Sequence, residues 1–310
     1  MQNFYDLAII GAGIAGVSSA VYAKRAGLNF VIFESGSVGG QLLFMDRVDN
    51  FIGLGLNVSG YQLAEQLSKT LNDLDIKPVF EKVIKINIEE KIVKIWTEKN
   101  FYTSKALIIA TGASFKKLQI KGEDEFIGKG VSYCAVCDGF FFKNKTVAVV
   151  GGGNTAVGEA LYLSGICSKV YLIHRREKLR ALNYLQDALF KKENVEIIYN
   201  HIVTQINGKN FVEEIILEDN ENKLKKNLNV DGVFIAIGIT ANTQIFKDIV
   251  DIDENGFILT DENLKTSLDF IWAIGDCRKR PLRQLITAAA EGSIAALEAY
   301  KYLKTPYISI

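Results

Sequence analysis

Apolar and polar positions at the beginning of the chain follow the order strand, helix, strand. Residues 4–10 and 30–33 are short apolar runs, which is typical of strands buried on both faces of a parallel sheet. The stretch from Val17 to about Ala26 between them is predicted to be a helix. Because parallel strands joined through a helix form a βαβ unit, this part of the chain predicts an α/β fold.

The same order of elements returns in the middle of the chain. Residues 146–150 and 169–173 are again short apolar runs, and a helix ending near Leu163 is predicted between them. With 310 residues, the chain is long enough for two domains. We therefore expect two Rossmann-like, dinucleotide-binding units within one α/β protein.

A glycine-rich turn follows the first strand, and an acidic residue ends the second. The turn reads Gly11-Ala12-Gly13-Ile14-Ala15-Gly16, and the acid is Glu34. In this dinucleotide fingerprint Gly11 allows the tight turn, Gly13 lets the backbone approach a pyrophosphate, and Gly16 lets helix and strand pack closely. The helix N-terminus offers N–H groups to the phosphate, and Glu34 is suited to ribose hydroxyls. A dinucleotide site is predicted, with a glycine-rich turn that binds nothing as the alternative.

The second copy carries the glycine-rich turn but not the acid. Its turn reads Gly151-Gly152-Gly153-Asn154-Thr155-Ala156, and its second strand ends at His174-Arg175-Arg176. His174 follows Gly151 by 23 positions (174 − 151), the spacing that also separates Glu34 from Gly11 (34 − 11). An acid at this position suits a free ribose, whereas arginine suits a 2′-phosphate. The second site is therefore predicted to bind NADP rather than NAD, with a solvated run of charges as the alternative.

Three further segments favour FAD in the first site. Gly39-Gly40-Gln41 follows Glu34, where the extended phosphate and ribityl chain of a flavin would run. Residues 107–112, which end in Ala110-Thr111-Gly112, resemble the strand and turn common to flavoproteins that bind two dinucleotides. A strand is predicted at 271–274, and the aspartate of the following Gly275-Asp276 is placed to bind ribityl hydroxyls. An ordinary strand-to-loop turn is the alternative for this last segment.

The order of these segments sets the domain map. Gly275-Asp276 belongs with the first site, so the second nucleotide unit is predicted to be inserted into the first. We expect an FAD-binding domain formed by residues 1–115 and 242–310, and an NADPH-binding domain formed by residues 116–241. The crossing segments, at 112–114 and 237–242, contain small residues that suit a hinge.

Charge and composition narrow the choice of partners. Lys plus Arg and Asp plus Glu both number 36, so no basic surface for nucleic acid is expected. Residues 1–6 lack the basic and apolar regions of a signal peptide, and no apolar run reaches the roughly 18 residues of a membrane helix. We therefore expect a cytoplasmic protein that binds neither nucleic acid nor membrane.

Two of the four cysteines are close together. Cys134-Ala135-Val136-Cys137 precedes the second glycine-rich turn, while Cys167 and Cys277 are isolated. In a reducing cytosol a close pair is catalytic or binds a metal, and a C-x-x-C pair cycles readily between dithiol and disulfide. Asp138 is placed to donate and accept the protons that this cycle needs. Half a zinc site is the alternative, but the sequence has no matching motif for the other two ligands, so no metal is expected.

These motifs occur in an order that resembles the bacterial-type, low-molecular-weight thioredoxin reductases, and the resemblance covers nearly the whole chain. It implies an FAD domain, an inserted NADPH domain carrying the C-x-x-C, and a homodimer. It also implies that electrons pass from NADPH through FAD to the Cys134–Cys137 disulfide, and then to a disulfide of thioredoxin or a thioredoxin-like protein. Nicotinamide and cysteines must both reach one flavin, so we hypothesise that the inserted domain rotates about its linkers.

The resemblance assigns roles to single residues. Cys134, Cys137 and Asp138 are the expected catalytic residues, with Cys137 nearest the flavin. Phe140 and Phe141 match aromatic residues that help to dock thioredoxin, with buried packing at the start of a strand as the alternative. The residues expected to bind FAD are Gly11, Gly13, Ala15, Gly16, Glu34, Gly40, Gln41, Asn50, Ala110, Thr111, Gly112, Gly275, Asp276, Arg283 and Gln284. Those expected to bind NADPH are Gly151, Gly153, Asn154, Thr155, Ala156, His174, Arg175, Arg176 and Arg180.

Three positions depart from the family pattern without removing a reacting group. Ile52 stands where proline is normal, Val136 where threonine is usual, and Gly158 where glutamate is common. Rival members of the wider group fit less well. A peroxiredoxin-reducing relative would carry an additional N-terminal domain, which is not expected because the first strand begins at residue 4. A ferredoxin-dependent relative would lack the second fingerprint and its arginines. A reductase of a different protein disulfide and a flavoprotein redox sensor stay open as alternatives.

Overall fold

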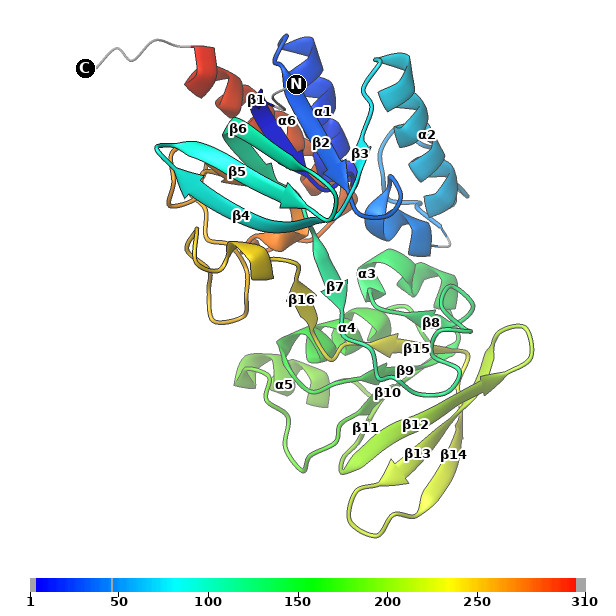
Figure 1. Cartoon of the computed structure of the whole chain (residues 1–310). Helices are drawn as coiled ribbons and strands as arrows, with labels where there is room; N and C mark the ends of the chain where they lie inside the picture. The colour runs from blue at the N-terminus through cyan, green and yellow to red at the C-terminus, as the bar shows by residue number, and fades with distance from the viewer. Residues whose placement is uncertain (1–3, 46, 305–310) are drawn as a thin grey trace. The chain divides into compact units, whose positions relative to one another are not determined.

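The computed structural model describes residues 4–45 and 47–304. The chain divides into two compact units, coloured along the sequence in Figure 1. Unit 1 combines Met1–Ser114 with Thr240–Ile310, and unit 2 is Phe115–Ile239. The chain leaves unit 1 once and returns to it once, so unit 2 is an insertion within unit 1.

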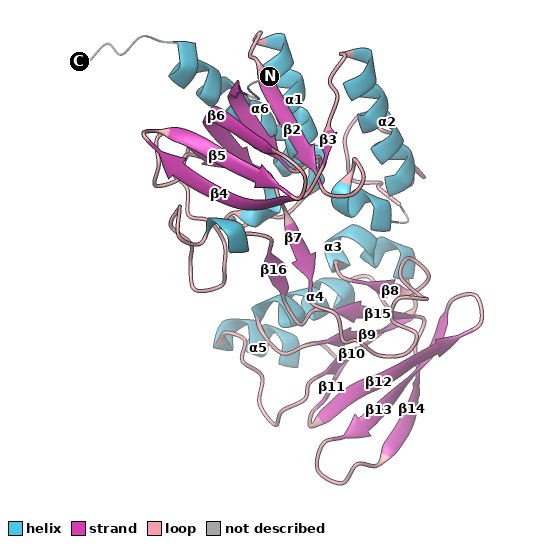
Figure 2. Ribbon diagram, in the orientation of Figure 1, coloured by secondary structure: helices cyan, strands magenta, loops and turns pink. Residues whose placement is uncertain are grey.

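Unit 1 is built on a seven-stranded sheet of order β3-β2-β1-β6-β5-β4, with β17 paired to β6. Strands β1, β2, β3, β6 and β17 are mutually parallel, and β4 and β5 continue the sheet as an antiparallel hairpin (Figure 2). The strands are β1 (Phe4–Ile10), β2 (Phe30–Glu34), β3 (Val79–Phe80), β4 (Val83–Glu89), β5 (Ile92–Thr97), β6 (Phe101–Ile109) and β17 (Ile271–Ala273).

Alternate residues of β1 enter two different hydrophobic cores. Leu7 and Ile9 pack in the core beneath the helices, whereas Ala8 and Ile10 pack in the core on the opposite face. This period of two explains why the strand reads as a continuous apolar run. The helices of unit 1 are α1 (Ile14–Arg25), α2 (Gly60–Asp73) and α6 (Leu285–Lys304), and its 3-10 turns are η1 (Gly40–Phe44), η3 (Gln244–Phe246) and η4 (Gly275–Cys277).

Helices α1 and α6 pack against each other although they lie at opposite ends of the sequence (Figure 1). A Cβ atom on Gly292 would lie 2.3 Å from the carbonyl oxygen of Ala15, so only glycine permits this approach. The hydroxyl of Ser18 donates a hydrogen bond of 2.6 Å to the carbonyl oxygen of Ala289. The first nucleotide helix is therefore held by the last helix of the chain.

Unit 2 contains a five-stranded parallel sheet of order β11-β10-β9-β15-β8 and a separate antiparallel sheet, β12-β13-β14. The parallel strands are β8 (Val131–Ser132), β9 (Thr146–Val150), β10 (Lys169–Ile173), β11 (Val195–Ile198) and β15 (Gly232–Ile235). The antiparallel strands are β12 (His201–Gly208), β13 (Val212–Asp219) and β14 (Lys225–Asn229). The helical segments are α3 (Ala135–Asp138), η2 (Gly139–Phe142), α4 (Asn154–Ser164) and α5 (Asn183–Phe190).

The two segments that join the units pair with each other. Strand β7 (Ala113–Phe115) and strand β16 (Ile239–Ala241) form a two-stranded sheet of their own. On the side of unit 1, the amide of Asn242 donates a hydrogen bond of 3.0 Å to the carbonyl oxygen of Gly112. The passages out of and back into unit 1 are thus regular paired strands.

The predicted fold class is confirmed. Strands β1, β9 and β10 have the bounds expected from the apolar runs, and β2 is one residue longer. The predicted start of the first helix is wrong, because α1 begins at Ile14 rather than Val17. Its N-cap is Gly13, so the helix starts directly out of the glycine-rich turn. Among the described residues, no helix is long and apolar enough to cross a membrane.

Candidate functional site

The glycine-rich turn of unit 1 is possible only with glycine at two of its positions. Gly11 has a φ of +106°, and a Cβ there would lie 2.4 Å from the carbonyl oxygen of Ala110. A Cβ on Gly16 would lie 1.8 Å from the carbonyl oxygen of Gly11. The amide of Gly11 donates a hydrogen bond of 2.8 Å to Phe33 at the end of β2. These contacts clamp the turn between two strands and the helix.

The remaining glycine of this turn, Gly13, is not needed for packing. A Cβ on Gly13 would meet no atom within 4 Å. The N–H groups at the start of α1 donate no hydrogen bond to a capping side chain, and the first turn of the helix has no acidic residue. Helix α2 differs, because Ser59 and Gln62 form a complete capping box at its start. An open backbone and an uncapped helix N-terminus fit a phosphate group.

Glu34 is held at the rim of the same turn. Its Oε2 accepts a hydrogen bond of 2.8 Å from the amide of Ala12, and its Oε1 accepts one of 2.8 Å from the amide of Gly36. The hydroxyl of Ser35 donates a longer hydrogen bond of 3.5 Å to the same Oε1. A carboxylate has about four acceptor positions, so these three bonds still leave capacity for a ribose hydroxyl. The structure thus places Glu34 beside the turn, as an acid that contacts a nucleotide ribose requires.

Other predicted flavin residues form contacts that join distant parts of unit 1. The side-chain amide of Gln41, in η1, donates to the carbonyl oxygen of Ala113. Asn50 donates a hydrogen bond of 3.0 Å to the Oε1 of Gln284. The guanidinium of Arg283 lies 4.4 Å from the centre of the Phe257 ring, and its buried Nε has no hydrogen-bond partner among the described residues. A buried donor without a partner is costly, and a bound polar ligand would satisfy it.

Asp276 belongs to a buried ionic cluster that the motifs did not indicate. Arg280 lies 3.8 Å from the Oδ1 of Asp276 and 3.4 Å from the Oε2 of Glu291. Glu291 also accepts a hydrogen bond of 2.7 Å from the amide of Gly275. Burial raises the pKa of Asp276, and the charges of Arg280 and Arg283 oppose that shift. Sequence reasoning missed Arg280 and Glu291, and the one available signal was a charged residue within the apolar final helix.

The turn of unit 2 repeats the geometry of the first. The amide of Gly151 donates a hydrogen bond of 3.0 Å to Ile173 at the end of β10. A Cβ on Gly151 would lie 2.4 Å from the carbonyl oxygen of Ala236, whereas one on Gly153 would meet no atom within 4 Å. Gly153 is the N-cap of α4, which also lacks a side-chain cap and a first-turn acid. This turn therefore offers the same open N-terminus to a pyrophosphate.

The basic cluster of unit 2 has a buried member and three exposed members. A Cβ on Gly152 would lie 2.2 Å from the ring of His174, which is 3% exposed and hydrogen-bonds through Nε2 to the carbonyl oxygen of Lys178 at 3.0 Å. Burial lowers the pKa of His174, which favours the neutral ring. The exposed members are Arg175, Arg176 and Arg180, and none of them forms an ion pair with another described residue.

The close cysteines form a disulfide at the start of α3. The Cα atoms of Cys134 and Cys137 are 5.3 Å apart, and the amide of Cys137 donates a hydrogen bond of 3.2 Å to the Sγ of Cys134. Asp138 follows directly, and its Oδ2 accepts a hydrogen bond of 2.6 Å from the hydroxyl of Ser132. Among the described residues, no group of three or more His, Cys, Asp or Glu is arranged to hold a metal ion.

Comparison with known proteins settles the family. Residues 5–292 match the family model described as pyridine nucleotide-disulphide oxidoreductase. A thioredoxin reductase of Peptoclostridium acidaminophilum is 38% identical over 99% of both chains. The chain belongs to the thioredoxin reductase family. A thioredoxin reductase structure from Streptococcus pyogenes, 38% identical, covers 99% of this chain and all of its own, with a TM-score of 0.95. A ferredoxin-flavin thioredoxin reductase from Clostridium acetobutylicum shares 30% identity over 99% of this chain and all of its own, with a TM-score of 0.55.

Membership of the thioredoxin reductase family makes the protein an oxidoreductase that binds a flavin and a pyridine nucleotide. The three departures from the family pattern lie where substitution is sterically easy. The side chain of Ile52 is 85% exposed and that of Val136 is 52% exposed. A Cβ on Gly158 would meet no atom within 4 Å. Among the described residues, neither Ile52 nor Val136 belongs to a hydrophobic core.

The aromatic residues after the cysteine pair have different surroundings. Phe140 is 69% exposed, whereas Phe141 packs against the core of unit 2 and Phe142 is buried in it. They form the 3-10 turn η2 rather than the start of a strand, which corrects the alternative interpretation of this segment. Of these three aromatic side chains, Phe140 is the exposed one.

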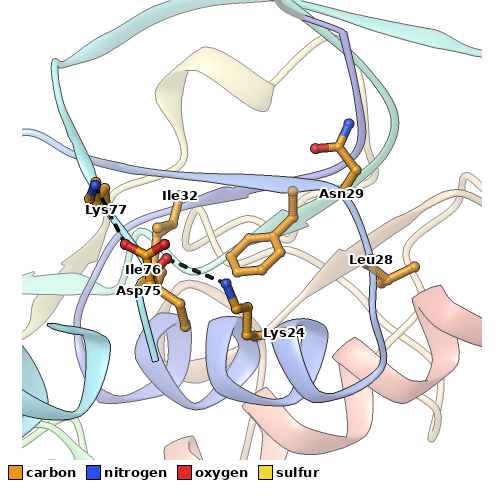
Figure 3. A pocket seen from close by; sticks show the side chains of 8 residues that line it. Lys24, Leu28, Asn29, Ile32, Asp75, Ile76 and Lys77 are labelled. Carbon is orange, nitrogen blue, oxygen red and sulfur yellow. Dashed lines mark hydrogen bonds and ion pairs between the residues drawn. The ribbon is translucent and has the colours of Figure 1, made fainter. Parts of the chain in front are cut away.

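A surface depression in unit 1 lies away from the glycine-rich turn. It encloses about 200 Å³ between the end of α1 and the start of β2, with Lys24, Asn29, Asp75 and Lys77 among its lining residues (Figure 3). Lys24 reaches the carbonyl oxygen of Asp75 at 3.4 Å. Dinucleotides bind at the carboxyl ends of parallel strands, and this depression adjoins an amino end. It is therefore separate from the thioredoxin reductase site.

Proposed function

We propose that this protein is an NADPH-dependent thioredoxin-disulfide reductase that uses FAD and the Cys134–Cys137 disulfide. The observation that carries the proposal is the disulfide itself, with Asp138 beside it, in the same unit as a nucleotide turn flanked by arginines. Bound FAD supplies the means to take a hydride from NADPH and deliver two electrons to the disulfide. The alternatives are a reductase of another protein disulfide and a flavoprotein sensor.

FAD is assigned to the turn of unit 1. Its open cradle at Gly13, the placement of Glu34 and the unsatisfied Nε of Arg283 support this assignment. Gly40, Gln41, Asn50, Ala110, Thr111, Gly112, Asp276 and Gln284 would complete the contacts. Burial raises the pKa of Asp276, and the charges of Arg280 and Arg283 oppose that shift and so help the carboxyl to accept hydrogen bonds. The chemistry of this donor and acceptor set fits the hydroxyl-rich chain of a flavin dinucleotide.

NADPH is assigned to the turn of unit 2. Arg175, Arg176 and Arg180 surround the end of β10 and would bind a 2′-phosphate, while the neutral ring of His174 supports the turn from beneath. A ferredoxin-dependent enzyme would need neither this second turn nor its arginines. Their presence supports NADPH over a protein electron donor.

The cysteine pair and Asp138 perform the disulfide chemistry. Reduction of the disulfide consumes two electrons and two protons and gives two thiols, for which Asp138 exchanges protons. One thiolate then attacks a sulfur of the partner's disulfide, and the second thiol displaces the mixed disulfide to release a reduced partner. The amide of Cys137 points at the Sγ of Cys134, which favours a thiolate on Cys134.

Family resemblance supplies the remaining parts of the proposal. They are a homodimer, a cytoplasmic location and a rotation of the inserted unit about β7 and β16. The paired linkers support such a motion, because two short strands can turn together.

The decisive experiment is NADPH-dependent reduction of a panel of purified thioredoxin-like proteins. We expect sustained NADPH oxidation that requires a thioredoxin, and a much slower rate with NADH. A protein that binds FAD and is reduced once by NADPH, but turns over with no member of the panel, would instead be the sensor.

A further inference from the structure

One half-buried carboxyl group in unit 2 lies beside the redox pair and has no part in the chemistry described so far. Glu159 is on α4, the helix that starts from the second glycine-rich turn. Its Oε1 accepts a hydrogen bond of 3.3 Å from the amide of Ala135, the residue that follows Cys134. Its Oε2 is buried and has no hydrogen-bond partner among the described residues. A single side chain thus joins the nucleotide helix to the first turn of α3.

We propose that Glu159 is a positioning residue that fixes the Ala135 amide and, through its charge, sets the nucleophilicity of the adjacent dithiol. It rests on the proposed function, since it concerns the same cysteine pair. The contact orients the peptide that joins Cys134 to the helix. The carboxyl is also close enough, one peptide unit from Cys134, for its charge to act on a thiolate formed there.

The charge of Glu159 changes within the working pH range. Burial raises its pKa to about 7; the Ala135 hydrogen bond opposes the shift, and the charge of Asp138 adds to it. Other elements that pack against α4 carry Lys169 and Tyr171 on β10, and Tyr184 and Asp187 on α5. Asp138 is the one charged group that contributes to this shift. Below neutral pH the carboxyl is therefore neutral, and above it a negative charge stands beside the thiols.

A negative charge disfavours a neighbouring thiolate, so ionisation of Glu159 raises the pKa of the attacking thiol. The thiolate is the nucleophile in disulfide exchange. Between pH 6 and pH 8 the rate of thiol attack should consequently rise less than in a dithiol without this carboxyl. Ionisation of Glu159 opposes the increase in thiolate that a rising pH causes directly, so the rate of disulfide exchange depends less steeply on pH.

The test is the alkylation rate of the pair in FAD-loaded protein, reduced with a phosphine under nitrogen, at pH 6 and pH 8. Cys167 and Cys277 are buried and should not react in the folded protein. Glu159→Gln keeps an acceptor for the Ala135 amide but cannot ionise, whereas Glu159→Ala removes both the contact and the charge. Glu193→Gln, at an exposed position between α5 and β11, is the matched control.

We expect Glu159→Gln to match the unmodified protein at pH 6 and to react at least about threefold faster at pH 8. Glu193→Gln should match the unmodified protein at both values. Identical rates for Glu159→Gln and the unmodified protein at pH 8 would overturn the proposal. The unmodified protein alone provides a second check. Its alkylation rate plotted against pH should show an inflection near pH 7 from Glu159, in addition to the inflection from the thiol. A profile with a single inflection would contradict the proposal. Since no thioredoxin is used, failure of this inference is distinct from failure of the proposed function.

Discussion

The two glycine-rich turns share a backbone but differ in the residues that complete them. Gly11 and Gly151 each donate to the end of the neighbouring strand, at 2.8 Å and 3.0 Å, and each lies too close to a carbonyl oxygen for any Cβ. The positions of Gly13 and Gly153 are both open. The framework for a pyrophosphate is thus the same in both units, and specificity must come from elsewhere.

The two units differ at the end of the second strand. In unit 1 Glu34 bonds to the amides of Ala12 and Gly36, so an anion occupies the rim of the turn. In unit 2 His174 packs as a buried ring against Gly152, and arginines stand outside it. The comparison teaches that one backbone can serve two dinucleotides when a single position changes from an acid to a support for cations.

The largest expected effect distinguishes the role of the two nucleotide turns from the role of the cysteines. Cys134→Ser or Cys137→Ser should abolish thioredoxin reduction, because a single thiol can form a mixed disulfide but cannot resolve it. Both variants should still oxidise NADPH with a small acceptor that takes electrons directly from the flavin, since both nucleotide sites are intact. Cys167→Ser and Cys277→Ser are the controls and should keep both activities. Wild-type thioredoxin turnover by Cys134→Ser would remove the cysteine pair from the mechanism.

The last position of the fingerprint is Gly16 in unit 1 and Ala156 in unit 2. Substitutions there test whether the two turns are packed equally tightly. Gly16→Ala should lower the free energy of unfolding by about 3 kcal/mol, the upper end of the usual cost of overpacking, and weaken FAD binding, because its Cβ would lie 1.8 Å from a backbone oxygen. The matched position of unit 2 already holds Ala156, so Ala156→Gly should cost only about 1 kcal/mol. Denaturant unfolding and flavin content measure both effects. Equal losses in the two variants would contradict the asymmetry.

Substitution of an arginine after β10 tests the difference in charge between the two turns. Arg176→Ala should reduce kcat/KM for NADPH roughly 10- to 100-fold, since a hydrogen bond to a charged group contributes about 1.5–3 kcal/mol. The rate with NADH should stay nearly constant. Lys191→Ala, which removes an exposed cation after α5, is the control. Steady-state kinetics with both cofactors would reject the assignment if the ratio of kcat/KM for NADPH to that for NADH were the same in Arg176→Ala as in the unmodified protein.

The smallest expected effect concerns the buried imidazole. Burial lowers the pKa of His174 in the folded protein, so the unfolded chain binds more protons below its ordinary value of 6.5. The contribution of His174 to stability is therefore present above about pH 6.5 and is lost as the pH falls below it. Thermal unfolding at pH 7.5 and pH 5.5 should show a smaller difference for His174→Asn than for the unmodified protein. An unchanged difference would place the ring in solvent-like surroundings.

Most of the fold and the nucleotide turns could be predicted from the sequence, because they are local. A strand, a turn and a helix in sequence order carry their own signals, as β1 and Gly11–Gly16 do. The contacts that tune the site could not be predicted in this way. The bond of Glu159 to Ala135 depends on tertiary packing that no short motif encodes. The bond of Ser132 to Asp138 is local, but it depends on the fold of the turn around the cysteines. His174 was expected among the phosphate-binding residues, and only the packing against Gly152 reveals its support of the turn.

The contact between α1 and α6 has a consequence for the order in which the chain can fold during synthesis. Unit 2 contains all its own strands between Phe115 and Ile239, so it is complete before the ribosome reaches β17 and α6. Unit 1 begins earlier but lacks its last parallel strand and the helix that holds Ser18 until residues 271–304 have been synthesised. Domains that emerge first usually fold first. Here the inserted unit can acquire its structure while the unit that begins the chain still waits for its final helix.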